Sequence, residues 1–123
     1  MGRRVRILLA ALMVALFATA TVIPAVAATI SVNNQGAYVA RLAVRYNHDG
    51  EIKGAQSGNI TPGVTSSLEI PSDATAVSVT VDVATGLAGN PWAPIFSQSL
   101  GSAVTKTYRV FGTVLNPGWS EVN

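Results

Sequence analysis

Apolar and polar residues alternate along several short segments of this chain, and this period of two constrains its fold more than any other feature. Valines alternate with small polar residues through residues 77–83, and residues 38–46 and 64–70 repeat the pattern. Side chains two positions apart share one face of a strand, so these segments are predicted to be half-buried strands. Residues 95–98 and 104–111 are predicted to be further strands, and nothing after the first 27 residues shows a convincing helical period.

The breaks between these segments carry residues that favour turns. Residues 47–50 end in an Asp-Gly pair, which accommodates positive φ in a tight hairpin. Further loops are predicted where Gly, Pro and Asn gather, at residues 58–59, 62–63, 71–73 and 116–118. Five to eight short strands at this spacing predict an all-β fold, an antiparallel two-sheet β-sandwich.

The N-terminal segment resembles a secretory signal peptide. Three arginines lie within the first six residues, an uncharged apolar run follows, and small residues at 25–27 form a cleavage site. The alternative is an uncleaved anchor, because the uncharged run is about long enough to span a bilayer, but Pro24 favours cleavage. We therefore expect a signal peptide at residues 1–27 and one secreted domain at residues 28–123.

Removal of this segment changes the charge of the chain. Three of the eight basic residues lie in it, which leaves five basic residues against six acidic ones. A basic surface for nucleic acid or anionic lipid is therefore not supported, and no nucleic-acid partner is expected. The chain contains no cysteine, which excludes disulfides and thiolate chemistry.

Catalytic groups are scarce. His48 is the only histidine and lies in a predicted turn, where a solvated side chain is the simplest interpretation. Asn47, Asp49 and Glu51 offer alternating oxygens to calcium, but a solvated turn is favoured over so small a ligand set. A serine nucleophile would lack its usual Gly-x-Ser-x-Gly turn, and no glycine-rich phosphate loop occurs. We expect a binding or structural module with no enzymatic activity, no cofactor and no metal.

Two apolar loops remain as candidate binding surfaces. The first covers residues 85–94, within the apolar stretch ATGLAGNPWAPIF at residues 84–96, and the second covers residues 113–119. A loop of this composition either packs against its own domain or contacts a partner. Trp92 suits a membrane interface or the face of a sugar ring, and it also suits a plug that closes the end of a sandwich.

Three blocks of sequence resemble the C-terminal domain of the thiol-activated, cholesterol-dependent cytolysins. They are NQGAYVARLAV at residues 34–44, VTVDVATGLAGNPW at residues 79–92 and TYRVFGTVLNPG at residues 107–118. The blocks occur in the order of that family with roughly its spacing, and together they extend over nearly all of residues 28–123. The resemblance implies a β-sandwich of two antiparallel sheets, with the loops at one end facing a membrane.

The resemblance also implies candidate binding residues. The tryptophan-rich loop of the family corresponds to residues 84–93, and the Thr-Leu pair held to recognise cholesterol corresponds to a neighbouring loop here. The candidate membrane- or ligand-binding residues are therefore Thr85, Gly86, Leu87, Ala88, Trp92, Val114 and Leu115.

Several loop residues differ from those of the family, and these differences limit what can be expected of membrane binding. The cysteine position is Ala84, so thiol dependence is not expected, and two tryptophan positions are Gly89 and Pro91. The arginine that ends the loop in the family is replaced by Ala93. Val114 stands in the position of the cholesterol threonine, and its side chain cannot donate a hydrogen bond to a sterol hydroxyl.

The resulting functional hypothesis is a secreted, toxin-like, non-catalytic recognition module. It would bind membrane sterol or a cell-surface glycan through its end loops, and its length leaves no room for the pore-forming domains, so it is not expected to form pores alone. The alternative hypothesis is a structural or interaction protein, in which the apolar loops bind a protein partner or close the sandwich.

Overall fold

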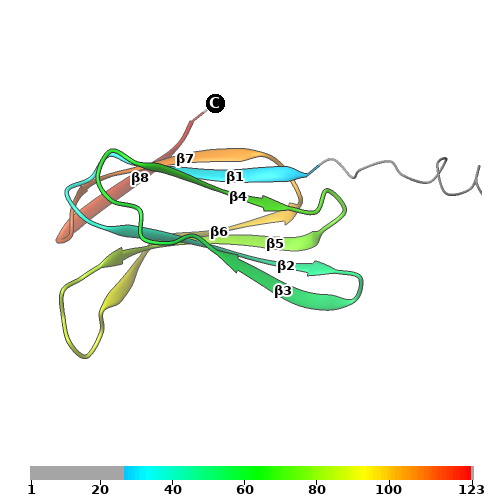
Figure 1. Ribbon diagram of the computed structural model, residues 1–123, viewed down its shortest axis with the longest axis horizontal. Helices are drawn as coiled ribbons and strands as arrows, with labels where there is room; N and C mark the ends of the chain where they lie inside the picture. The colour runs from blue at the N-terminus through cyan, green and yellow to red at the C-terminus, as the bar shows by residue number, and fades with distance from the viewer. Residues whose placement is uncertain (1–26, 123) are drawn as a thin grey trace, which may run out of the picture.

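The computed structural model describes residues 27–122, which form eight β-strands and no helix (Figure 1). The predicted signal peptide lies outside the described residues except for Ala27, and the boundary between leader and domain stays a prediction. Nothing among residues 27–122 forms an apolar helix of membrane-spanning length. The strands are β1 (Ala28–Asn34), β2 (Ala40–His48), β3 (Glu51–Gln56), β4 (Thr65–Ile70), β5 (Thr75–Ala84), β6 (Trp92–Ser102), β7 (Lys106–Thr113) and β8 (Asn116–Val122).

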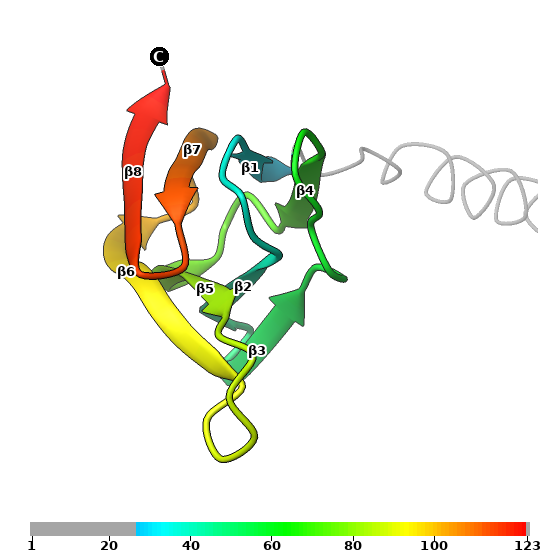
Figure 2. The same cartoon turned by 90° about the vertical axis from the view of Figure 1, so that its left-hand side faces the viewer.

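The strands form two four-stranded sheets that face each other, with strand orders β4-β1-β7-β8 and β3-β2-β5-β6 (Figure 2). The predicted two-sheet, all-β sandwich is confirmed. Every neighbouring pair is antiparallel with one exception: β1 runs parallel to β7, so that Ile30 pairs with Lys106. The first strand is thus held between β4 and a strand from the C-terminal third of the domain.

The inward faces of the two sheets supply the core. The four alternating valines of β5, between Val77 and Val83, are at most 1% exposed, as their period of two predicts. The other large side chains that are almost completely buried come from β1, β2, β4, β7 and the loop before β4. They are Ile30, Val32, Leu42, Val44, Ile60, Ile70, Tyr108 and Val110.

An aromatic stack packs between β6 and the β7–β8 pair. The ring of Phe96 stacks on Trp119 at a centroid distance of 4.2 Å and an angle of 14°, and it lies 5.0 Å from the ring of Tyr108. These contacts hold the two sheets together along the β6–β8 edge of the sandwich. The prediction of a loop at residues 116–118 is wrong, because β8 begins at Asn116 and only two residues form the turn before it.

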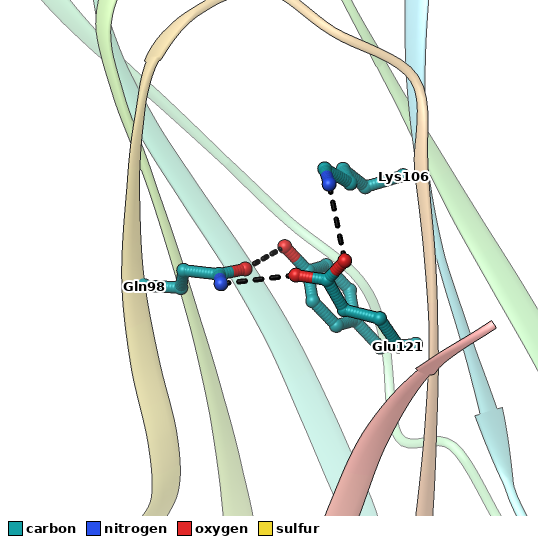
Figure 3. A network of polar contacts seen from close by, with 4 residues as sticks. Gln98, Lys106 and Glu121 are labelled. Atoms are coloured by element: carbon teal, nitrogen blue, oxygen red, sulfur yellow. Dashed lines mark hydrogen bonds and ion pairs between the residues drawn. The ribbon is translucent and has the colours of Figure 1, made fainter. Parts of the chain in front are cut away.

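A network of polar side chains also links β6 to β7 and β8 (Figure 3). The hydroxyl group of Tyr108 donates to Oε1 of Gln98, whose Nε2 donates to Oε1 of Glu121 over 3.0 Å. Nζ of Lys106 lies 3.1 Å from the other carboxylate oxygen of Glu121. The network therefore ties β6 of one sheet to β7 and β8 of the other.

Besides β8, two strands were not predicted from the sequence. β3 lies at the edge of its sheet and is exposed along almost its whole length. β1 does alternate in burial, but its inward positions include small and polar residues such as Ala28 and Asn34. The Asp-Gly turn is confirmed, since Asp49 and Gly50 have φ values of 53° and 78°.

The loops sort to the two ends of the sandwich. The connections β1–β2, β3–β4, β5–β6 and β7–β8 lie at the left of Figure 1, and the other three connections lie at the right. Both apolar loops of the sequence analysis therefore belong to one end, which faces the viewer in Figure 2.

Candidate functional site: the loop end of the sandwich

The β5–β6 loop, residues 85–91, is organised by Thr85. Its Oγ1 donates to the carbonyl oxygen of Asn90 over 2.5 Å and accepts from the backbone N–H of Leu87 over 3.1 Å. Its own N–H donates to the carbonyl oxygen of Pro91 over 2.9 Å. Gly86 has a φ of 77°, a conformation that glycine adopts without steric cost. One threonine therefore bonds both branches of the loop.

This ordered loop directs apolar atoms outward. Leu87 is 63% exposed, and its neighbours Gly86 and Ala88 are exposed as well. In Figure 2 the loop extends beyond the sheets at the bottom of the view. A leucine this exposed on a fixed backbone contributes nothing to the core, so it is available for contact with another surface.

The β7–β8 turn divides its two candidate residues. Val114 is half-buried and packs against the core, whereas Leu115 is 96% exposed. Gly112 precedes the turn with a φ of 90°, and its carbonyl oxygen accepts from the N–H of Ala37 over 3.0 Å. Val114 thus helps to close the sandwich, and Leu115 is the side chain that projects.

Trp92 does not lie at the tip of the loop. It is the first residue of β6 and pairs with Ala84, whose neighbour Val83 points into the core. Trp92 is therefore on the outer face of the sheet β3-β2-β5-β6. The guanidinium carbon of Arg41 lies 4.0 Å from the centre of its ring. The interpretation of Trp92 as a plug that closes the sandwich is wrong.

Arg41 and Asp82 were not singled out as site residues by the sequence. They are paired across β2 and β5, with Nη2 of Arg41 3.7 Å from a carboxylate oxygen of Asp82. The alternation does place both residues on polar faces, but only the pairing of the strands brings them together beside Trp92. The loop end therefore contains two exposed leucines and, next to them, an arginine–tryptophan pair.

The opposite end contains the only histidine of the chain. Nε2 of His48 lies 2.9 Å from Asp73, and Nδ1 lies 3.4 Å from Asp49. The His48 side chain is 20% exposed, so the interpretation of a freely solvated histidine is wrong. Asp49, one of the three suggested calcium ligands, lies with His48 and Asp73 in a group whose possible ligand atoms are within 4.8 Å of one another. Contacts between side chains account for this group without an ion.

These features define the class of protein: a two-sheet β-sandwich with ordered loops that expose apolar side chains at one end. The family model of the thiol-activated cytolysin beta sandwich domain matches residues 29–118, and the chain belongs to this family. The resemblance seen in the three sequence blocks is thereby confirmed. No curated protein matches the sequence significantly.

Solved cytolysin structures share the fold. Suilysin from Streptococcus suis has 22% identity and a TM-score of 0.60, covering 80% of this chain and 24% of its own. The human-specific toxin intermedilysin has 26% identity and a TM-score of 0.59, covering 78% of this chain and 23% of its own. Listeriolysin O has 23% identity and a TM-score of 0.58, covering 80% of this chain and 22% of its own. The chain thus spans less than a quarter of the length of these cytolysins.

Proposed function

We propose that the domain is a secreted, non-catalytic recognition module that binds a sterol-containing membrane through the loops at one end of its sandwich. The observation that carries the proposal is the exposure of Leu87 and Leu115, 63% and 96%, on two separate loops of that end. Membership of the cytolysin sandwich family supports it. Apolar tips of this kind favour a lipid surface over a glycan, because they offer no side-chain hydrogen bonds to sugar hydroxyls.

Binding by a single domain is weak on this proposal. Full burial of two leucines contributes about 3–6 kcal/mol, and association costs at least about 4 kcal/mol in lost freedom. Useful retention therefore requires several copies on one membrane or a specific contact with sterol. Leu115 would make that sterol contact, since Val114 has no hydroxyl group and is half-buried.

Liposome flotation with and without cholesterol tests the proposal. We expect the purified domain to float with cholesterol-containing liposomes. The double variant Leu87→Ala/Leu115→Ala should remain in the bottom fraction of the gradient. Ile52→Ala is the matched control, because Ile52 is 72% exposed but lies next to the β2–β3 turn at the opposite end. Failure of the cholesterol-containing liposomes to retain the domain contradicts the proposal. An equal loss of liposome retention in Ile52→Ala would show that binding depends on exposed apolar area in general and not on the loop end.

A protein partner is the second candidate. Intermedilysin has been solved with human CD59, with 26% identity and a TM-score of 0.59 to this chain. The two leucines stand on loops whose backbones are hydrogen-bonded at Thr85 and Gly112, and such preformed loops suit a protein surface as well. Absence of liposome binding, together with capture of a purified receptor ectodomain that needs both leucines, would favour this function.

A further inference from the structure

We propose that the end of the sandwich opposite the loop end carries a site for a divalent metal ion of the zinc class. The ligands are the ring of His48 and the carboxylate groups of Asp49 and Asp73, whose ligand atoms all lie within 4.8 Å of one another. They belong to the β2–β3 turn and the β4–β5 connection, at the right of Figure 1. Side-chain contacts hold this group together without an ion, and the same contacts place its ligand atoms for one.

The separation of the ligand atoms fits coordination to one ion. Nitrogen and oxygen ligands lie about 2.0–2.2 Å from Zn²⁺, so two ligands of a tetrahedral ion are about 3.4 Å apart. Nε2 of His48 and Oδ1 of Asp73 are already 2.9 Å apart, and a carboxylate oxygen of Asp49 lies 3.4 Å from the other ring nitrogen. The Asp49 and Asp73 side chains are 79% and 71% exposed, so both carboxylates are free to rotate toward a shared ion.

The backbone holds the ligand-bearing segments in tight turns. Asp49 has a φ of 53° in the turn between β2 and β3. In the connection that contains Asp73, the N–H of Ala74 donates to the carbonyl oxygen of Pro71 over 3.1 Å. The ring of His48 is mostly buried between these two turns and has few orientations available. Binding of an ion therefore requires little further ordering of the chain.

The charge around the group favours a cation. Within residues 27–122, the ion pairs that involve a lysine or an arginine are Arg41–Asp82 and Lys106–Glu121. Asp49 and Asp73 therefore have no basic partner in this part of the chain other than His48. Glu51 pairs with His48 across the β2–β3 hairpin and adds a third carboxylate nearby. With a neutral ring the group carries two negative charges, which a divalent ion neutralises.

The imidazole ring determines the class of ion. Ca²⁺ and Mg²⁺ prefer sites made of oxygen ligands, whereas a nitrogen ligand beside two carboxylates suits Zn²⁺ and related transition-metal ions. The ring of His48 coordinates as neutral imidazole through one nitrogen and keeps its proton on the other. Three protein ligands leave the fourth position of a tetrahedral ion to water. A bound ion joins the β2–β3 turn to the β4–β5 connection and thereby stabilises this end of the sandwich.

Calorimetric titration with ZnCl₂ of the protein purified without a histidine tag tests the proposal. His48 is the only histidine, so its ring-proton NMR signals identify the ligand directly and should shift when zinc is added. His48→Gln and Asp73→Asn should each weaken binding at least about tenfold. Glu69→Gln is the matched control, because Glu69 is exposed but lies outside the group, and it should keep the affinity. At a hundredfold excess of zinc over Kd, the midpoint of thermal unfolding should rise by about 10 °C.

Four outcomes would overturn the site: no binding at millimolar zinc, ring signals of His48 that do not move, equal affinity in the His48 and Glu69 variants, or binding of CaCl₂ as tight as that of ZnCl₂. If His48→Gln does not fold, unchanged affinity in Asp73→Asn overturns the site instead. The variant Leu87→Ala/Leu115→Ala should bind zinc normally. Failure of the membrane proposal is thereby distinguished from failure of this one.

Discussion

Arg41 and Trp92 form a stacked pair on the outer face of the sheet β3-β2-β5-β6, with 4.0 Å between the guanidinium carbon and the ring centre. The pair joins β2 to β6 across β5, because Asp82 of the intervening strand also lies 3.7 Å from Arg41. The tryptophan at the start of β6 is thereby held on the side of the sandwich, so the β5–β6 loop presents Leu87 without it.

The first prediction concerns this pair. Arg41→Ala should lower the free energy of unfolding by about 1–2 kcal/mol, since it removes a partly desolvated cation–π contact and leaves Asp82 without its partner. Urea denaturation followed by circular dichroism measures the change. Arg109→Ala, whose guanidinium carbon is 6.0 Å from the Phe111 ring, should cost less than about 0.5 kcal/mol. Equal costs would show that the Arg41 stack contributes nothing specific.

The second prediction concerns Thr85 as the residue that positions Leu87. Thr85→Val keeps the shape of the side chain but removes the hydroxyl group that bonds Asn90 and Leu87. We expect weaker retention by cholesterol-containing liposomes although both leucines remain, and we expect Thr85→Ser to restore it. A loss of stability of about 1 kcal/mol accompanies the missing hydrogen bonds. Full retention by the valine variant would show that loop order does not matter for binding.

The third prediction compares two glycines of the β7–β8 hairpin. Gly112→Ala should destabilise the domain by about 1–3 kcal/mol, because the residue has a φ of 90° and the new methyl group would meet the backbone oxygen of Asn116. Gly118→Ala should cost less, since its methyl group would meet the ring of Phe111, which is 40% exposed and able to swing away. Thermal unfolding of the two variants checks the order, and a reversed order contradicts it.

The fourth prediction concerns Asn34, which is completely buried and connects three segments. Its Nδ2 donates to the carbonyl oxygens of Tyr38 and Ile60 over 2.7 and 2.8 Å, and its Oδ1 accepts from Gly36 over 2.9 Å. Asn34→Asp replaces both donated bonds by repulsion between oxygens, so we expect a loss of at least about 3 kcal/mol. Denaturant titration at neutral pH measures it. A loss below 1 kcal/mol would contradict this role.

The fifth prediction concerns pH. Burial, followed by the charge of Glu121, raises the pKa of Tyr108 from 10.0 to about 12. Because the folded-state pKa is the higher one, this contribution to stability is complete below pH 10 and is lost as the pH rises toward 12. Absorbance titration of tyrosinate should show a component near pH 12 that disappears in Tyr108→Phe. Ionisation of every tyrosine near pH 10 in the folded domain would contradict the prediction.

At acidic pH the dependence of stability on pH has the opposite sign, because the pKa of Glu121 is lowered. Hydrogen bonds from Gln98 and Lys106 lower the pKa of Glu121 below its ordinary value of 4.5. Its contribution is therefore present above pH 4.5 and is lost as the pH falls through the lower folded-state pKa. Gln98→Ala should move the pKa of Glu121 upward, and NMR titration of the Glu121 carboxyl group detects this shift.

Much of the fold could be predicted because alternation reports burial directly. The valines of β5 and the inward residues of β2 follow the pattern without a break. β3 could not be found in this way, since an exposed edge strand has no buried side to mark it. The start of β8 was hidden by Pro117 and Gly118, which resemble turn residues but pair with Gly112 and Phe111 in the hairpin.

The candidate site was less predictable than the fold. The family resemblance identified the loops, and the structure then showed that Leu87 and Leu115 project while Val114 packs inward. Local sequence cannot separate Val114 from Leu115, because their exposure depends on the twist and register of the β7–β8 pair. The contact between Arg41 and Trp92 joins residues far apart in the chain, and no local pattern reports such a contact.

The parallel pairing of β1 with β7 joins strands from the two ends of the domain. Ile30 and Val32 gain their neighbours Lys106 and Tyr108 only after nearly the entire chain has been synthesised. Until then β1 has β4 as its single partner, and two strands do not make a stable sheet on their own. The pairing of β1 with β7 is therefore a contact of high sequence separation, and such contacts slow folding. A chain that stops before β7 leaves Ile30 and Val32 uncovered, and both ends of the domain are needed to bury its centre.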